Sequence, residues 1–268
     1  MKILSIDIGI KNLAIAIIDH NNSSDKFTID NWSVINLCNQ IPNCSSCTKP
    51  AKFTKNENHY CKKHTKNIDY KIPNINIQKL SKQSMKNLMN IATEFSIEFI
   101  KSINKTELIL LIEEYMNNSC FEIIETVSAN NINLIDVGVN LKLELNKVFE
   151  TIDLSSIDLI LIENQISPIA NRMKTIQGMV AQYFINCNNY NIEFFSAANK
   201  LKLFKEVKKT TYSQRKKMSV QYTRELLLEK NMENNLEYFN NHKKKDDLAD
   251  CFLQAIYYLS TFNKLVIN

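Results

Sequence analysis

The sequence lacks long apolar runs and has very little glycine or proline. No stretch approaches the roughly 20 consecutive apolar residues of a membrane-spanning helix, and the first residues lack the order of a secretory signal. We therefore expect a soluble, intracellular protein with no membrane partner. Only 3 glycines and 4 prolines occur beside abundant Ile, Asn and Lys, which indicates an AT-rich genome and says nothing about function.

Cysteine and chain length set the next limits. The seven cysteines are an odd number without a secretory signal, which favours free thiols or metal ligands over a disulfide framework. A chain of 268 residues with 44% hydrophobic content can bury a sizeable core. One large domain, or one domain with an insertion, is expected.

Charge is distributed unevenly along the chain. Residues 42–86 carry ten Lys against two acidic residues, and residues 200–245 carry thirteen Lys or Arg against five Glu. Residues 87–163 carry four Lys against thirteen Asp or Glu. This segregation favours a polyanionic partner such as nucleic acid, although solvated surface lysines would give the same count.

Apolar periodicity predicts a mixed α/β fold. Residues 2–8 and 13–18 are expected to form a hairpin whose turn, GIKN, places Gly9 where a positive φ is available, and residues 27–37 would add a third strand. Later segments alternate: strands are predicted at 141–149, 158–164 and 192–197, and helices at 169–186, 213–230 and 246–262. This order predicts a mixed sheet flanked by helices, with residues 38–135 inserted.

Four acidic residues occupy positions that suggest a metal site. Asp7 interrupts the first apolar strand, Glu163 ends the LILIE strand, and Asp247 and Asp250 share a face of the last helix. Each alone has an ordinary alternative, such as a helix first turn or a buried ion pair. If the two strands are neighbours, the carboxylates converge, and two Mg²⁺ ions about 4 Å apart could offset their repulsion and hydrolyse a phosphodiester.

Four blocks carry a family resemblance. ILSIDIGIKNLAIAIID, LILIENQ, NRMKTIQGMVAQYF and KKKDDLADCFLQA resemble, in order, the signature blocks of RuvC-like Holliday junction resolvases of the poxvirus and fungal-mitochondrial branch. The resemblance covers about residues 1–36 and 136–262. It implies an RNase H-like five-stranded mixed sheet and a Mg²⁺-dependent endodeoxyribonuclease, with Mn²⁺ as an expected substitute. The substrate would be a four-way DNA junction, cut by a homodimer. The amphipathic pattern of residues 169–186 makes this helix the expected contributor to the dimer interface, unless its apolar stripe only packs on the sheet.

The resemblance also assigns residues. Asp7, Glu163, Asp247 and Asp250 fall on the catalytic magnesium ligands, and the role of Asp246 stays open. Lys200 is the candidate for the family's basic residue near the active site. The expected DNA-binding residues of the basic segment are Lys200, Lys208, Lys209, Arg215, Lys216 and Lys217. Residues 1–37 and 136–268 would form the discontinuous nuclease domain. The implied location is a site of DNA replication: a viral factory in host cytoplasm for a virus, otherwise mitochondrion or nucleus.

The insertion contains a second metal pattern. Cys44-x2-Cys47-x13-Cys61-x2-His64 has the ligand types and spacing of a structural zinc site, predicting a zinc ribbon over about 38–66, with Cys38 and His59 as possible substitutes. Six lysines around it suggest phosphate contact: Lys49, Lys52, Lys55, Lys62, Lys63 and Lys66. A helical segment over about 78–135 follows. Its residues 80–116 weakly resemble a SAP-type module, but four Lys against five Glu favour a structural or partner-binding role.

Two other functions remain open from the sequence. The same fold and carboxylates could serve a nuclease for flaps or RNA·DNA hybrids, because a fold does not choose its substrate. A catalytically idle architectural DNA-binding protein could use the ribbon and the basic segments, although an intact set of carboxylates argues against it.

Overall fold

The chain folds into two compact units in the computed structural model. The structure describes residues 1–21, 26–38, 41–100, 102–125, 127–166, 171–197, 199–203, 211–262 and 265–266. The sheet unit comprises Met1–Asn39 and Val127–Asn268, and the inserted unit comprises Gln40–Thr126. Residues 127–135, expected in the insertion, therefore lie with the sheet unit. Within the described ranges, no helix has the length and apolar character to cross a membrane.

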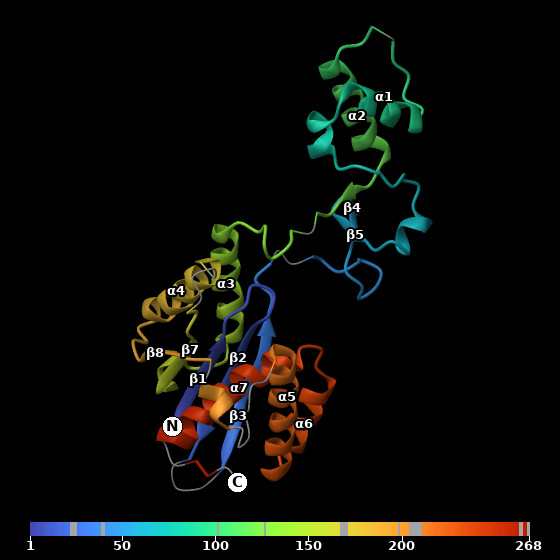
Figure 1. Ribbon diagram of the computed structural model, residues 1–268. Helices are drawn as coiled ribbons and strands as arrows, with labels where there is room; N and C mark the ends of the chain where they lie inside the picture. The colour runs from blue at the N-terminus through green and yellow to red at the C-terminus, as the bar shows by residue number, and fades with distance from the viewer. Residues whose placement is uncertain are drawn as a thin grey trace. The chain divides into compact units, whose positions relative to one another are not determined.

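A five-stranded sheet forms the centre of the sheet unit (Figure 1). Its order is β3-β2-β1-β7-β8, from β1 (Lys2–Asp7), β2 (Leu13–His20), β3 (Phe27–Ile35), β7 (Leu159–Glu163) and β8 (Ile192–Phe195). The first three strands form an antiparallel meander, and β1, β7 and β8 pair in parallel. The predicted mixed five-stranded sheet flanked by helices is thus confirmed.

Helices cover both faces of this sheet. On one face α3 (Leu134–Val148) and α4 (Asn171–Asn186) share a buried core with alternate residues of β1 and β7 such as Leu4 and Ile160. On the other face α7 (Lys245–Phe262) packs on β1 and β2, with α5 (Tyr212–Glu229) and α6 (Glu233–Asn241) beside it. Because successive strand residues face opposite sides, each of these strands can send every second side chain toward α7.

The α3 helix corrects a prediction from the sequence. Residues 141–149 begin with Leu alternating with charged residues and were expected to form a strand, but residues 141–148 form the second half of α3 and Phe149 is its C-cap. Val137, Leu141 and Leu145 are its buried stripe, and Leu143, which completed the alternation, is 52% exposed. An exposed leucine therefore produced the strand-like pattern.

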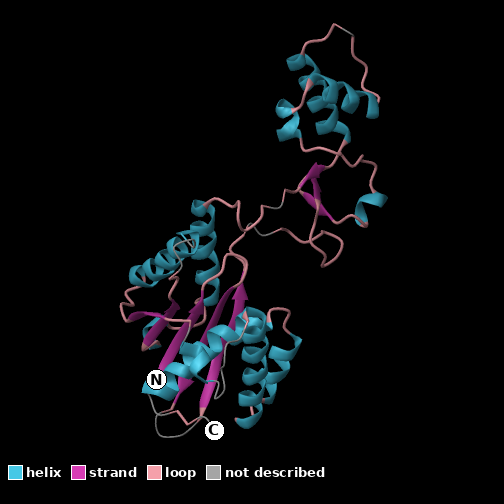
Figure 2. Ribbon diagram, viewed as in Figure 1, coloured by secondary structure: helices cyan, strands magenta, loops and turns pink. Residues whose placement is uncertain are grey.

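The inserted unit combines a small ribbon with a helical half. Its three-stranded sheet has the order β5-β4-β6, from β4 (Phe53–Lys55), β5 (Asn58–Tyr60) and β6 (Glu122–Ile123). The helices α1 (Met85–Glu94) and α2 (Lys105–Ser119), drawn in cyan in Figure 2, pack around a separate apolar core. The remaining elements are short 3₁₀ turns: η1 (His64–Asn67), η2 (Ile77–Lys82), η3 (Leu154–Ser156) and η4 (Asn199–Leu203).

Candidate active site

Asp7 and Glu163 stand side by side at the carboxyl ends of two paired strands. In the parallel pairing of β1 with β7, Ile6 lies opposite Ile162, so the next residue on each strand is one of the two carboxylates. Strand alternation puts Asp7 on the same face as Ile3 and Glu163 on the same face as Leu161, and both apolar residues pack in the core beneath α7. Both carboxylates therefore lie on the α7 side of the sheet.

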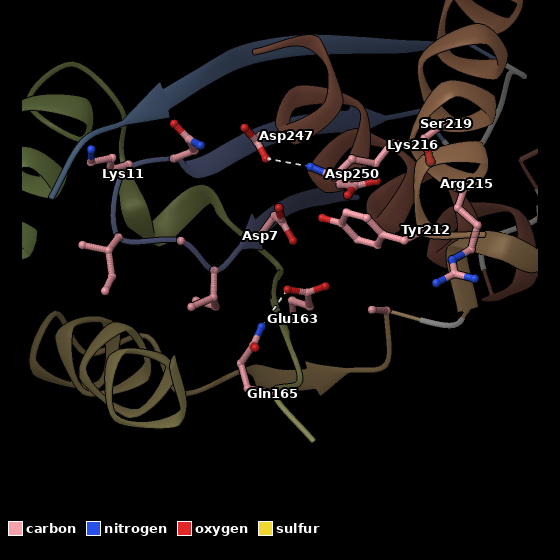
Figure 3. A pocket seen from close by; sticks show the side chains of 15 residues that line it. Asp7, Lys11, Glu163, Gln165, Tyr212, Arg215, Lys216, Ser219, Asp247 and Asp250 are labelled. Carbon is pink, nitrogen blue, oxygen red and sulfur yellow. Dashed lines mark hydrogen bonds and ion pairs between the residues drawn. The ribbon is translucent and has the colours of Figure 1, made fainter. Parts of the chain in front are cut away.

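Helix α7 brings two more carboxylates to the same place. Asp247 and Asp250 lie in its first two turns, and both line a pocket together with Asp7 and Glu163. Figure 3 shows these four side chains around one space. Trp32, on β3, anchors the start of α7. Its indole N–H donates to the Leu248 carbonyl at 3.0 Å, and its ring stacks on Phe239 with ring centroids 5.1 Å apart.

A lysine on α5 contacts two of the acidic residues at the start of α7. The Lys216 ammonium contacts Asp246 at 2.5 Å and Asp247 at 4.0 Å. Burial is the largest single influence on the pKa of Asp246 and raises it, but the hydrogen bond and the charge of Lys216, with smaller contributions from a backbone N–H and Lys244, together hold the pKa below its usual value. Burial, together with the charge of Asp246, raises the pKa of Asp247. Asp246 is thus an ion-pair partner of Lys216.

The donor set suits hard divalent cations. The buried Oδ2 of Asp247 has no hydrogen-bond partner among the described residues. A buried carboxylate oxygen without a partner is costly, and four carboxylates around one pocket repel each other. Cations of the Mg²⁺ type take oxygen ligands of this kind, so the residues fit a divalent metal site.

Two glutamines that the sequence analysis did not single out connect this cluster to α4. The Gln165 side-chain amide donates to Glu163 Oε2 at 2.7 Å, and the backbone N–H of Gln165 donates to Gln177 Oε1 at 2.8 Å. Gln177 is buried on α4. The signal was present, because LILIENQ and NRMKTIQGMVAQYF contain both residues, but amides carry no charge pattern to reveal a role.

The basic residues expected to bind DNA fall into three groups: those that line the pocket, one that lines a neighbouring hollow, and those outside the described residues. Arg215 and Lys216, on α5, line the pocket with Tyr212, and Lys11 joins them from the β1–β2 turn. Lys217 instead lines a neighbouring hollow with Lys243 and Lys245. Lys208 and Lys209 lie outside the described residues, as does the side chain of Lys200 on η4.

The β1–β2 turn needs glycine for a reason other than the expected one. Gly9 lines the pocket, and no described glycine has a positive φ, so the predicted left-handed conformation is wrong. A Cβ built on Gly9 would lie 2.4 Å from the backbone oxygen of Asn12. Close approach of the two backbones therefore requires glycine here.

A second cluster lies in the inserted unit. One ligand atom from each of Cys44, Cys47, Cys61 and His64 lies within 4.8 Å of every other. The sulfurs of Cys47 and Cys61 are 3.8 Å apart, and the Cys44 sulfur is 3.3 Å from His64 Nδ1. Zinc–sulfur bonds of about 2.3 Å in a tetrahedron would hold two sulfurs about 3.8 Å apart, so this cluster is compatible with a closed structural zinc site.

The alternative ligands and one lysine lie elsewhere. Cys38 is buried in the core of the sheet unit, and His59, on β5, is not part of the cluster of ligand atoms. Lys55, expected to touch phosphate, is buried, donates to the Asn117 carbonyl and lies 4.9 Å from the centre of the Tyr70 ring. Its role is structural because its charge is held inside the unit.

Comparison with known families decides the relationship. The model described as "Poxvirus A22 protein" matches residues 107–264, which is more than half of the chain. The chain belongs to this family. A second model, "Mitochondrial resolvase Ydc2 / RNA splicing MRS1", matches residues 3–129, so the two together span 3–264. The resemblance to poxvirus-type and mitochondrial resolvases is confirmed, and the A22-family chain is an endonuclease of the resolvase class, which implies use of a divalent metal.

The chain is also similar to individual proteins over most of its length. "Uncharacterized protein L451" of Acanthamoeba polyphaga mimivirus is 27% identical over 315 residues, covering 97% of this chain and 74% of that protein. Among solved structures, the fowlpox virus resolvase in complex with Holliday junction DNA is 16% identical, covers 97% of this chain and 98% of its own, and has a TM-score of 0.45. The yeast mitochondrial resolvase Ydc2 is 18% identical, with coverage of 96% and 78% and a TM-score of 0.45.

Proposed function

We propose that the chain resolves four-way DNA junctions by phosphodiester hydrolysis, with Asp7, Glu163, Asp247 and Asp250 as its catalytic carboxylates. The observation that supports this most directly is the convergence of four carboxylates, carried by three separate elements, on one pocket. Family membership supports the reaction class. The sheet unit is the proposed nuclease domain, and the inserted unit is an accessory to it.

The same four residues are the proposed ligands of two Mg²⁺ ions, with Mn²⁺ as a substitute. When bound, the two ions would polarise the scissile phosphate and lower the pKa of the attacking water. The chain's own groups hold the surroundings in order. Lys216 keeps Asp246 ionised and paired, so that this carboxylate does not compete with the other four for the metal ions. Arg215 and Lys11, which line the pocket, offer positive charge for the DNA phosphates.

Two further parts complete the proposal. Cys44, Cys47, Cys61 and His64 hold a structural zinc ion in the inserted unit. Two copies of the chain act together, because the described part of each chain offers one such carboxylate set and resolution of a junction requires two opposed cuts. The sites of DNA replication remain the proposed location.

A substrate panel with isosteric variants tests the function. Asp7→Asn and Glu163→Gln should each lower the cleavage rate of a labelled junction by at least about 100-fold, because loss of a ligand exceeds the cost of losing an outer-shell partner. Junction binding should be unchanged or tighter, since repulsion of the DNA phosphates is relieved. Glu193→Gln, an exposed change on β8, is the matched control and should cut normally.

The panel also separates the alternatives. Junction, flap, duplex and RNA·DNA hybrid substrates are compared in Mg²⁺. Faster cutting of flaps or hybrids than of junctions would replace the proposed substrate. Near wild-type cutting by either variant would reject the carboxylate assignment, and absence of cutting with every substrate would favour the architectural protein.

A further inference from the structure

Charge divides the inserted unit into two parts. Residues 41–71, which include the Cys–His cluster, carry seven lysines against Glu57 and Asp69. Residues 72–125, which include α1 and α2, carry five lysines against seven glutamates. The basic part therefore coincides with the ribbon, and the acidic part with the helical half.

Four lysines of the ribbon lie close in sequence to the candidate zinc ligands. Lys49, Lys62, Lys63 and Lys66 are all exposed, and each lies within two residues of a ligand. Backbone hydrogen bonds close both knuckles, from the Cys44 N–H to the Lys49 carbonyl at 2.8 Å and from the His64 N–H to the Cys61 carbonyl at 2.9 Å. Because the ligand atoms lie within 4.8 Å of one another, the two lysine-bearing turns are held next to each other.

These lysines have no structural task within the described part of the chain. No ion pair joins any of the four to a described acidic residue, whereas Lys79 of the helical half pairs with Glu125 at 2.6 Å. Lys55 and Lys71 are also engaged, with the Asn117 carbonyl and the Tyr115 hydroxyl respectively. Exposed like charges held together repel one another, and a polyanion offsets that repulsion.

We propose that Lys49, Lys62, Lys63 and Lys66 form a second DNA-contacting surface, which binds the phosphate backbone of a duplex arm. Lysine ammonium groups act as point charges, so this surface would add affinity without reading sequence. It is separate from the carboxylate pocket and belongs to a unit with its own core. The inference rests on the proposed DNA substrate, and the bound metal would keep the lysines together.

The test compares two sets of substitutions in the full chain. The ribbon set is Lys49→Gln, Lys62→Gln and Lys63→Gln, and the control set is Lys82→Gln, Lys86→Gln and Lys105→Gln in the helical half. Both sets remove the same charge from exposed positions of the same unit. Equal zinc content, measured by elemental analysis, shows that both variants keep the ribbon folded.

Binding is measured by fluorescence anisotropy on a junction and on a duplex with the sequence of one arm, across a salt series. Ca²⁺ replaces Mg²⁺ to prevent cleavage, because a chelator would also strip the ribbon metal. The ribbon set should weaken binding by about tenfold or more at low salt. It should also reduce the slope of log affinity against log salt by about 3, at roughly 0.9 per lost phosphate contact.

Each outcome decides one of the two proposals. Equal weakening by both sets, or none by the ribbon set, would overturn the inference even if the wild-type chain cuts junctions. If the wild-type chain cuts no junction but the ribbon set still loses duplex affinity, the ribbon surface stands and the proposed function falls. An RNA hairpin is titrated in the same way, and a loss of affinity for this hairpin alone would overturn the inference in favour of an RNA partner.

Discussion

At the scale of single residues, the Glu163 carboxylate is oriented by two amides from outside the acidic cluster. The Gln165 side-chain amide, two residues after the end of β7, donates to it, and the Gln177 side chain on α4 accepts a hydrogen bond from the Gln165 backbone N–H. The relay ties a proposed metal ligand to the buried face of a helix. Outer-shell partners of this kind fix the direction of a carboxylate and influence metal affinity.

Gln177→Leu should therefore weaken metal binding while leaving DNA binding unchanged. The leucine fills the same space but leaves the Gln165 N–H unpaired, so that Glu163 loses its fixed direction. We expect a 10- to 100-fold loss, on the order seen for outer-shell partners, in Mn²⁺ affinity measured by electron paramagnetic resonance and in cleavage rate at limiting Mg²⁺. Gln182→Leu, on the exposed side of α4, is the control. Unchanged Mn²⁺ affinity in Gln177→Leu would show that the relay only stabilises the fold.

The carboxylates could be predicted from the sequence, whereas their partners could not. Asp7 and Glu163 stand out in the sequence because a charge within or at the end of a buried apolar strand is costly. The pairing of Asp246 with Lys216 joins residues 30 positions apart, and it depends on how α5 packs on α7. Nothing local to either residue specifies that packing, so the sequence left the role of Asp246 open.

At the scale of elements, the strands of the sheet were predictable because they are short apolar runs or, in β3, an alternating segment, bounded by turns. The α3 helix was not, because Leu143 lies on its exposed face and gives residues 141–149 a period of two. Local pattern alone cannot separate a buried leucine from an exposed one. The ligand cluster and the helices α1 and α2 of the inserted unit were easier to predict than α3, because ligand spacing and helical periodicity are both local signals.

The ribbon is an element that should depend on metal for its fold. Its strands are two or three residues long, too short to be stable without the ligand cluster. We expect about one zinc per chain by elemental analysis, and loss of that zinc in a Cys44→Ser/Cys61→Ser double variant. Chelation should unfold the ribbon and leave the sheet unit intact, seen as selective loss of amide protection in residues 41–71. Cys187→Ser, at an exposed cysteine of the sheet unit, is the control and should retain the zinc. Retention of zinc by the double variant would contradict the ligand assignment.

At the scale of the whole molecule, α4, the helix expected to contribute the dimer interface, uses its apolar face for packing inside its own chain. The apolar stripe of α4, including Ile176, Val180 and Phe184, is buried in the core of the sheet unit. Helix α3 instead exposes Ile135, Val139 and Leu143, which are 72%, 53% and 52% exposed and spaced four residues apart. Residues at this spacing form one face of a helix.

The charges beside this stripe favour a second copy of α3 as its partner. If two α3 helices pack antiparallel about a two-fold axis through Val139, Ile135 of one copy meets Leu143 of the other. The same axis places Asp136 of one copy level with Lys142 of the other, on the two flanks of the apolar stripe, and both are exposed without an ion pair to a described residue. An isologous contact of this kind is self-complementary, and two-fold symmetry matches the two opposed cuts of a junction.

Val139→Glu should convert the expected homodimer to a monomer, because it places two like charges at the centre of the contact. Sedimentation velocity at micromolar concentration measures the change, and a cruciform plasmid should then yield nicked circles in place of linear product. Asp136→Lys alone should weaken the dimer through facing cations, and adding Lys142→Asp in the same chain should restore it. Restoration by the charge swap distinguishes a specific α3 contact from general loss of stability. A wild-type chain that sediments as a monomer with and without junction, and only nicks the plasmid, would refute paired cutting and favour a single-cut flap or hybrid nuclease.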